Sequence, residues 1–164
     1  MTSAPSDELE RLGTLIDKAR IGIITTVSAD GRLVSRPMSV QERGFDGDLW
    51  FFTEDPSHKT DEVRRNPQVN VALESGKGWV SIAGTAEVVK DAAKIDELWD
   101  TGAEAWFTDG RNDPKVALLR VVAHTAEYWS SDEPKPLVLF KYAKAAVTGG
   151  RPNVGEARTV DLDA

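Results

Sequence analysis

Two short segments of this chain place cationic and hydroxyl side chains where they could bind an anion. In the first, Ser35-Arg36-Pro37-Met38, an arginine lies beside a proline within a stretch that has strand character. Because Pro37 cannot donate to a β-ladder, the guanidinium of Arg36 must either reach solvent or meet an anion. Both interpretations stay open: a solvated arginine on an edge strand, or an arginine that binds an anion.

The second segment is Phe52-Thr53 followed by Ser57-His58-Lys59, which opens a short predicted helix. A helix N-terminus offers free amide donors and a partial positive charge, and both favour an anion. Thr53 and Ser57 would add hydroxyl donors, and Lys59 would add an ammonium. Taken alone, Ser57 is more simply a helix N-cap and Lys59 a surface lysine.

Aromatic side chains could supply a surface for a planar ligand. The chain has five tryptophans, and most tryptophans pack in cores or interfaces: Trp50, Trp79, Trp99, Trp106 and Trp129. Trp79 and Trp106 have glycine, threonine and charged neighbours. These two are therefore the candidates for contact with a ligand or a partner subunit.

Other kinds of catalytic site find little support in this sequence. The chain has no cysteine, which excludes disulfides, thiolate nucleophiles and cysteine-ligated metals. His58 and His124 fall on different predicted elements without a carboxylate at ligand spacing, so we expect no metal site. A Ser57–Lys59 nucleophile pair lacks an accompanying nucleophile elbow or oxyanion loop. No catalytic residue is assigned.

Composition favours one domain with a small-molecule ligand. The chain has 164 residues, and 40% are hydrophobic, which is enough for one core. Its net charge of −7 argues against a nucleic-acid partner, because nucleic-acid binders neutralise many phosphates. The N-terminus lacks the pattern of a signal peptide, and no apolar stretch reaches the length of a membrane span. We therefore expect a cytoplasmic protein with no membrane partner.

The elements that must position these residues are mainly strands. Patterning predicts strands over 21–27, 33–41, 49–53, 69–74, 79–89 and 116–129, and helices over 7–19, 59–66, 91–100 and 137–147. Asp30-Gly31 predicts a hairpin turn, Pro37 an edge or a bulge, and Gly84 a bulge or a close backbone approach. Trp106 falls in a segment predicted to be irregular.

This order predicts an α+β fold, mainly β with helices, built on about six antiparallel strands. Residues 1–148 are expected to form the domain. Residues 149–164 are expected to form a C-terminal tail that packs on the domain or on a dimer partner.

The order and spacing of the motifs resemble a known family. S-R-P-M, L-W-F-F-T, S-H-K before N-P, V-N-V-A-L and W-V-S-I-A-G-T-A follow one another as in the pyridoxamine-phosphate-oxidase-like FMN-binding split barrels. A W-F segment, a D-P, an A-E-Y-W strand end and K-Y-A-K-A are similar to the general stress protein 26 branch. The resemblance runs from about Leu9 to the tail.

The resemblance implies a six-stranded antiparallel split barrel that forms a homodimer with a flavin in each interface groove. It also implies that the motif positions contact the flavin. Those along the ring and ribityl chain are Arg36, Pro37, Met38, Ser39, Phe52 and Thr53; those at the phosphate are Ser57, His58 and Lys59; the outer contacts are Trp79 from the facing strand and Trp106 from the partner chain.

Two departures from the true oxidases argue against vitamin B6 oxidation. His58 stands where they carry arginine, and Gln41 where they carry lysine. The chain also lacks a counterpart of their basic C-terminal residues. The expected function is therefore FMN binding with flavin-dependent redox activity on an unknown substrate, with a role in a stress response. The alternatives are a non-catalytic flavin carrier or sensor, or a deazaflavin-dependent reductase; FAD is an alternative cofactor.

Overall fold

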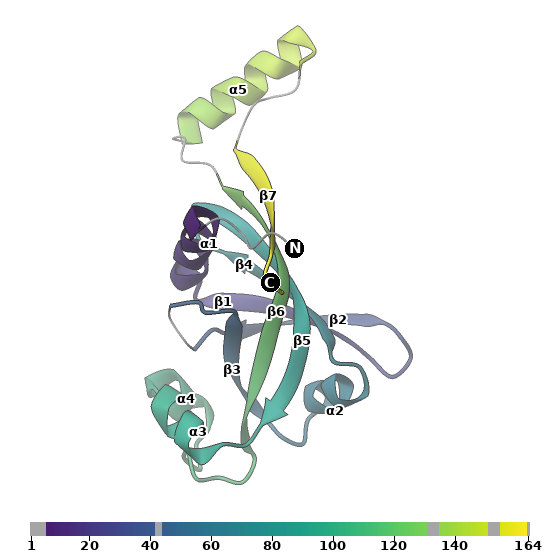
Figure 1. Ribbon diagram of the computed structural model, residues 1–164, viewed down its shortest axis with the longest axis vertical. Coiled ribbons are helices and arrows are strands. Elements are labelled where there is room, and N and C mark those ends of the chain that lie inside the picture. Colours follow the sequence, from purple (N-terminus) through teal and green to yellow (C-terminus); the bar gives the residue numbers. More distant parts are fainter. Residues whose placement is uncertain (1–5, 42–43, 131–134, 151–154, 164) are drawn as a thin grey trace.

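The computed structural model describes residues 6–41, 44–130, 135–150 and 155–163 (Figure 1). Its helices are α1 (Ser6–Lys18), α2 (His58–Arg65), α3 (Ala92–Leu98), α4 (Thr101–Trp106) and α5 (Lys135–Thr148). Its strands are β1 (Ile21–Val27), β2 (Leu33–Ser39), β3 (Asp48–Glu54), β4 (Gln68–Glu74), β5 (Gly78–Val89), β6 (Val116–Ser130) and β7 (Glu156–Asp161).

Strand β6 organises the sheet because it pairs along both of its edges. On one edge it carries β5, from Gly78 opposite Ser130 to Val89 opposite Leu118. On the other edge its first half pairs with β3 and its second half with β7. The strand order is β2-β1-β4-β5-β6-β3, antiparallel throughout, with β7 beside β6.

The sheet curls but does not close into a barrel. β2 and β3 are the two ends of the strand order, and the backbone amide of Gln41, just beyond β2, donates to the carbonyl of Trp50 in β3 at 3.0 Å. Within the described ranges no ladder joins β2 to β3. This open antiparallel sheet with helices is the α+β split-barrel architecture expected from the sequence.

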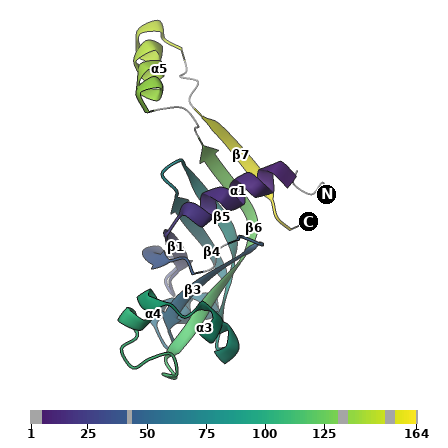
Figure 2. The ribbon, with the colours of Figure 1, turned by 90° about the vertical axis from the view of Figure 1, so that its left-hand side faces the viewer.

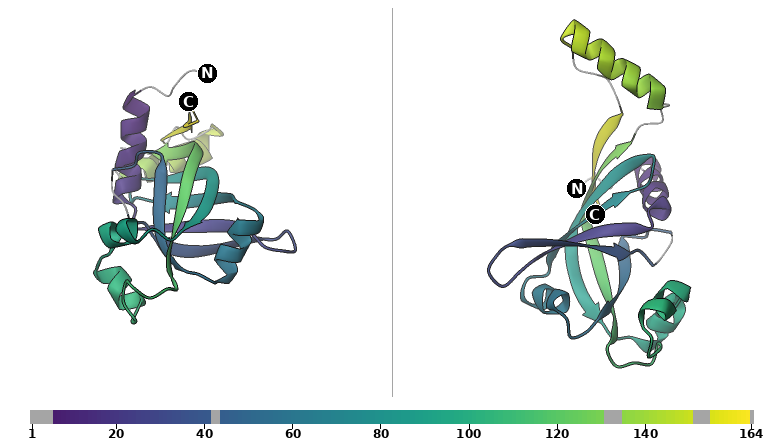
Figure 3. Two further views of the ribbon diagram at one scale, coloured as in Figure 1. Left: turned by 60° about the horizontal axis from the view of Figure 1, so that its bottom comes forward. Right: turned by 180° about the vertical axis from the view of Figure 1, so that it is seen from behind.

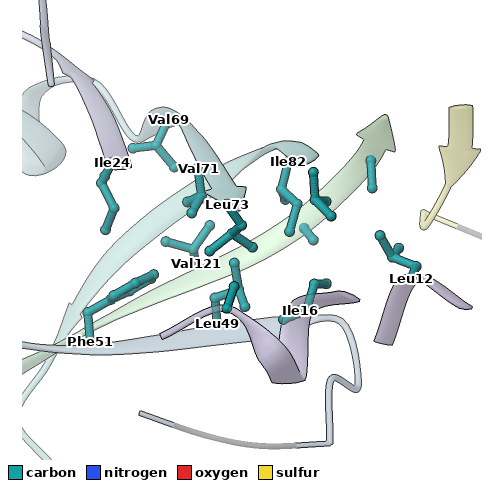
Figure 4. Packing of buried hydrophobic residues seen from close by; sticks show 14 of the residues in the cluster. Leu12, Ile16, Ile24, Leu49, Phe51, Val69, Val71, Leu73, Ile82 and Val121 are labelled. Atoms are coloured by element: carbon teal, nitrogen blue, oxygen red, sulfur yellow. The ribbon is translucent and has the colours of Figure 1, made fainter. Parts of the chain in front are cut away.

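Alternation along the strands creates the main core. In β4, for example, Val69, Val71 and Leu73 point inward, as expected for a strand with one buried face. Helix α1 closes this core with Leu12 and Ile16, which pack toward the side chains from the sheet (Figure 4). Burial of these aliphatic side chains is the main source of stability for the sheet.

A second apolar cluster attaches α3 and α4 to β3 and β6. The ring of Phe52 meets Trp99 edge-on at 5.5 Å and Phe107 at 6.0 Å between centroids. Ile95 and Leu118 complete the contact from α3 and β6. As a result α3 and α4 lie, like α2, at the end of the molecule opposite α5 (Figures 1 and 3).

Two glycine and proline predictions are confirmed. β2 is an edge strand, since it pairs only with β1. The missing amide of Pro37 therefore costs the sheet no hydrogen bond between strands. At Gly84 the β5–β6 register shifts, and a Cβ on Gly84 would collide with the backbone carbonyl of Val122. The bulge therefore requires glycine at this position.

Two sequence predictions need correction. The described sheet has seven strands, not six, because residues 156–161 of the predicted tail form β7. Residues 151–154 and 164 of that tail lie outside the described residues. The segment before Trp106 is helical, not irregular, because Asp100 caps α4: its carboxylate accepts from the amide of Ala103 at 2.8 Å.

Helix α5 stands away from the rest of the chain, at the far end of β6 and β7 (Figure 2). Leu139, Phe140, Tyr142 and Val147 are all more than half exposed on it. None of the described helices is both long and apolar enough to cross a membrane.

Candidate functional site

The N-terminus of α2 is built by a reciprocal cap. The amide of Thr60 donates to the hydroxyl of Ser57 at 3.3 Å, and the amide of Ser57 donates to the hydroxyl of Thr60 at 2.9 Å. Ser57 is therefore the N-cap, as its simpler interpretation required. The cap leaves the amides at the next two positions, His58 and Lys59, as the free donors of the first turn.

The loop that enters α2 is held by a buried carboxylate. Asp55 accepts from both terminal nitrogens of Arg64, at 2.6 Å and 2.9 Å, and its Oδ2 lies 3.1 Å from Nζ of Lys90. The hydrogen bonds from Arg64 and Lys90 outweigh the effect of burial and hold the pKa of Asp55 far below its usual range. This arrangement ties the loop to α2 and to the end of β5.

Arg36 meets an anion, but that anion belongs to the protein. Its Nη1 donates to the hydroxyl of Thr26 at 2.7 Å, and its Nη2 donates to Oε2 of Glu62 at 2.9 Å. Thr26 in turn donates to the same carboxylate oxygen at 2.6 Å. Of the two sequence interpretations, the structure therefore favours the arginine that binds an anion over the freely solvated one, and the anion is Glu62 of the same chain.

The Glu62 carboxylate remains ionised in this position. Burial alone would raise its pKa, but the hydrogen bonds from Thr26 and Arg36 overcome that effect, so the pKa lies below its usual range. Only 11% of the Glu62 side chain is exposed, against 22% for Arg36. A salt bridge this well covered is screened less by salt than an exposed pair.

Lys59 shares this environment. Partial burial lowers the pKa of its ammonium, the nearby charge of Arg36 lowers it further, and Glu54 and Glu62 oppose the shift. The two cations predicted to hold a phosphate are therefore close enough to repel each other. The fold brings them together from β2 and α2, which are separate in sequence.

A cavity of about 280 Å³ lies between the β1–β2 turn and α2. Its charged lining residues are three carboxylates, Asp30, Asp61 and Glu62, together with Arg65 and the ring of His58. Neither Arg36 nor Lys59 lines it. This acidic cavity adjoins the pair of cations but is itself unsuited to a phosphate.

The remaining β2 and β3 residues alternate between faces. Arg36 and Met38 point to the inner side, where Met38 packs on the main core, whereas Pro37 and Ser39 are exposed on the other side. Thr53 is buried. Its neighbour Phe52 faces Trp99 and Phe107, so the side chains of Phe52 and Thr53 leave β3 on opposite faces.

The two candidate tryptophans lie apart from this group and from each other. Trp79 is 61% exposed beside Trp129, its cross-strand partner, at the end of β5 nearest α5. Trp106 is 77% exposed at the end of α4, at the opposite end of the molecule (Figure 1). Within one chain the structure brings together Arg36, Ser57, His58 and Lys59, and leaves both tryptophans outside that group.

Sequence reasoning missed two members of the site, Thr26 and Glu62. The Asp-Gly hairpin would have located Thr26, because pairing Arg36 with Ile24 puts Thr26 diagonally beside it on the same face. Glu62 lies three positions after Lys59, on the same side of α2. Its contact with Arg36, however, depends on how α2 packs against the sheet.

A further polar network was also unexpected. His124 lies at the bulge of β6. Its Nε2 is 3.1 Å from the hydroxyl of Thr85, and its Nδ1 is hydrogen-bonded to the carboxylate of Asp163. These contacts join the segment after β7 to the sheet. Among the described residues, no group of three or more His, Asp or Glu side chains is arranged so that it could hold a metal ion.

Comparison with known proteins places this geometry in context. A family model described as "Pyridoxamine 5'-phosphate oxidase like" matches residues 7–153. Protein bli-3 of Neurospora crassa is 30% identical over 172 residues, which cover 97% of this chain and 82% of that protein. General stress protein 26 of Bacillus subtilis is 27% identical over 138 residues, covering 81% and 96% of the two chains.

One similar solved structure bears directly on ligands. It is the general stress FMN/FAD binding protein from Xanthomonas citri, with a TM-score of 0.69 and 29% identity. The match covers 79% of this chain and 93% of that one.

Proposed function

The chain belongs to the pyridoxamine 5'-phosphate oxidase-like family, and we propose that it binds FMN by its phosphate at the N-terminus of α2. The observation that carries this proposal is that α2 meets β2 at Arg36: Glu62 of α2 accepts from Arg36 at 2.9 Å, and Lys59 lies three residues before Glu62 on the same helix, so both cations lie in one region. Two like charges held near each other favour an anion between them. The flavin-binding relative from Xanthomonas citri supports the same ligand class.

The donors present fit a phosphomonoester. Lys59 supplies an ammonium, and the amides of His58 and Lys59 are the free donors of the first turn of α2. Arg36 has five N–H donors, and the two contacts to Thr26 and Glu62 engage only one on each terminal nitrogen. Donors therefore remain for a ligand. His58, exposed on the same turn, adds a cation when it is protonated.

FMN would supply hydride or electron transfer when bound, and the protein would supply binding and orientation. We infer a flavin-dependent oxidoreductase of unknown substrate, working in the cytoplasm and linked to stress. The fold offers β2 and β3 residues on both faces of the sheet and two exposed tryptophans for the flavin ring. No residue of this group is assigned as a catalytic acid or base.

We also propose that two chains form a homodimer. Helix α5 has 14 residues and exposes four large apolar side chains, yet an isolated helix of this length is marginal in water. The exposed pair Trp79 and Trp129 lies near its base. A second copy of the chain would cover both surfaces, and it would bring its own Trp106 to the first chain's flavin.

Light scattering on the purified chain tests the dimer. We expect twice the chain mass at micromolar concentration, and Phe140→Asp should shift the population toward monomer. Lys144→Asp, a charge-changing substitution at an exposed position on the same helix, should not. A monomer mass for the unmodified chain, with and without FMN, would contradict the proposal.

An absorbance spectrum tests the ligand. The purified protein should be yellow, or become so with FMN, and should bleach with NADH or NADPH and recolour in air. Binding of FMN without bleaching would indicate a flavin carrier or sensor. A colourless protein that ignores FMN but binds a deazaflavin would replace the proposal with a deazaflavin-dependent reductase.

A further inference from the structure

The phosphate site carries its own negative charge. Glu62, taken as a whole residue, is 8% exposed. Its carboxylate accepts hydrogen bonds from both Arg36 and Thr26, so it is directed at the guanidinium. Glu54 and Glu62 both act on the ammonium of Lys59. Arg36 is therefore already paired with a carboxylate before any ligand is present, and the charges of Glu54 and Glu62 offset part of the positive charge at Lys59.

The acidic side of this site is continuous with the neighbouring cavity. Glu62 contacts Arg36 and also lines the cavity beside Asp30 and Asp61. A phosphate at Arg36 would therefore lie beside Glu62, at the edge of a cavity whose lining holds three carboxylates together with Arg65 and His58. Like charges near one another disfavour the charged forms of both groups.

We propose that Glu62 is a resident counter-anion of Arg36 that limits the affinity of the site for phosphate, so that FMN exchanges instead of staying permanently bound. This inference rests on the proposed binding of FMN at Arg36 and Lys59. Thr26 supports it, because its hydroxyl donates to Glu62 and accepts from Arg36, holding the carboxylate in place. Glu62 need not leave for the phosphate to bind, since Arg36 retains free donors.

Glu62→Gln tests the proposal, because it removes the charge while keeping the shape and an acceptor oxygen. The matched control is Asp61→Asn, which removes an equal charge from the adjacent exposed position, one that lines the cavity without contacting Arg36. Binding of FMN and of riboflavin, which lacks the phosphate, is measured by fluorescence titration at low salt.

We expect Glu62→Gln to tighten FMN binding about tenfold or more and to leave riboflavin binding within about twofold. Asp61→Asn should change FMN binding by less than about threefold, because its charge is exposed. Unchanged or weaker FMN binding by a folded Glu62→Gln protein would overturn the inference. That result would instead make Glu62 a residue that only positions Arg36.

The unmodified chain provides a second test that does not depend on the folding of a variant. Coupling is reciprocal, so if Glu62 opposes the phosphate, bound FMN must raise the pKa of Glu62. Carbon-13 NMR of the Glu62 carboxyl should show a rise of about one pH unit with FMN, matching a tenfold effect. Riboflavin, which has no phosphate, should leave the pKa of Glu62 unchanged. A Glu62 pKa that does not rise with FMN would also overturn the inference.

The proposed phosphate site and the proposed role of Glu62 can be contradicted separately. If the unmodified chain binds riboflavin as tightly as FMN, the phosphate site itself is wrong. If it prefers FMN but Glu62→Gln and the carboxyl titration show no coupling, only the role of Glu62 is wrong.

Discussion

The guanidinium of Arg64 donates hydrogen bonds to the carboxylate of Asp55 from both terminal nitrogens, at 2.6 Å and 2.9 Å. This pair joins the second half of α2 to the loop before its first residue. Lys90, just beyond β5, meets the same carboxylate at 3.1 Å. The position of the proposed phosphate-binding turn therefore depends on a carboxylate that would not itself contact the ligand.

Replacing Asp55 by Asn should destabilise the fold by about 2 kcal/mol at pH 7, because two charge-assisted hydrogen bonds are weakened. The pKa of Asp55 is lowered by folding, so its stabilising effect is present above the unfolded pKa of about 3.9 and is lost as pH falls toward the folded pKa. Urea unfolding at pH 7 and pH 3 measures the difference, which should shrink at the lower pH.

Asp96→Asn is the control for this prediction. Asp96 pairs with Arg111 at 3.3 Å, but both side chains are about half exposed, so its loss should cost less than about 0.5 kcal/mol. Equal losses of stability for the two variants would show that the Asp55 ion pair stabilises the fold no more than an exposed ion pair does.

Lys59→Ala should weaken FMN binding about ten- to a hundredfold and riboflavin binding hardly at all, because riboflavin has no phosphate to lose. Fluorescence titration with both ligands measures this, and Lys18→Ala, an exposed lysine at the end of α1, is the control. Equal weakening for the two ligands would assign Lys59 to the fold instead of the phosphate.

Gly84→Ala should destabilise the protein by about 1–3 kcal/mol or more, because the new Cβ would collide with the carbonyl of Val122 across the bulge. Gly13→Ala should have the opposite effect on the stability of the protein. Gly13 is in the middle of α1, with no atom near its position for a Cβ, so alanine should stabilise by about 0.5–1 kcal/mol. Thermal unfolding of both variants checks the pair of signs.

Trp106→Ala should reduce flavin affinity and relieve the quenching of flavin fluorescence. The indole is 77% exposed in one chain, so its removal leaves no cavity and should not affect folding. Steady-state fluorescence of bound FMN is the measurement. Unchanged affinity and unchanged quenching would mean that Trp106 does not reach the flavin of the partner chain.

Much of the fold could be predicted from local sequence signals. Asp30-Gly31 produces the β1–β2 hairpin because these residue types suit a tight turn, and Pro37 requires an edge strand because it has no amide to donate. Gly84 indicated the bulge. β7 could not be predicted in the same way, because a six-residue strand with mixed polarity forms only where another strand, here β6, offers a free edge.

The sequence by itself made Arg36, Ser57, His58 and Lys59 the candidates for anion binding, since side-chain chemistry and position on an element are local properties. Only the tertiary structure decided what Arg36 meets. Nothing in the residues around Arg36 specifies a carboxylate, and Glu62 reaches it because α2 packs against β5 and β1 of the sheet. Charge on a side chain is determined by its type, but the net charge of a site depends on which distant side chains the fold brings beside it.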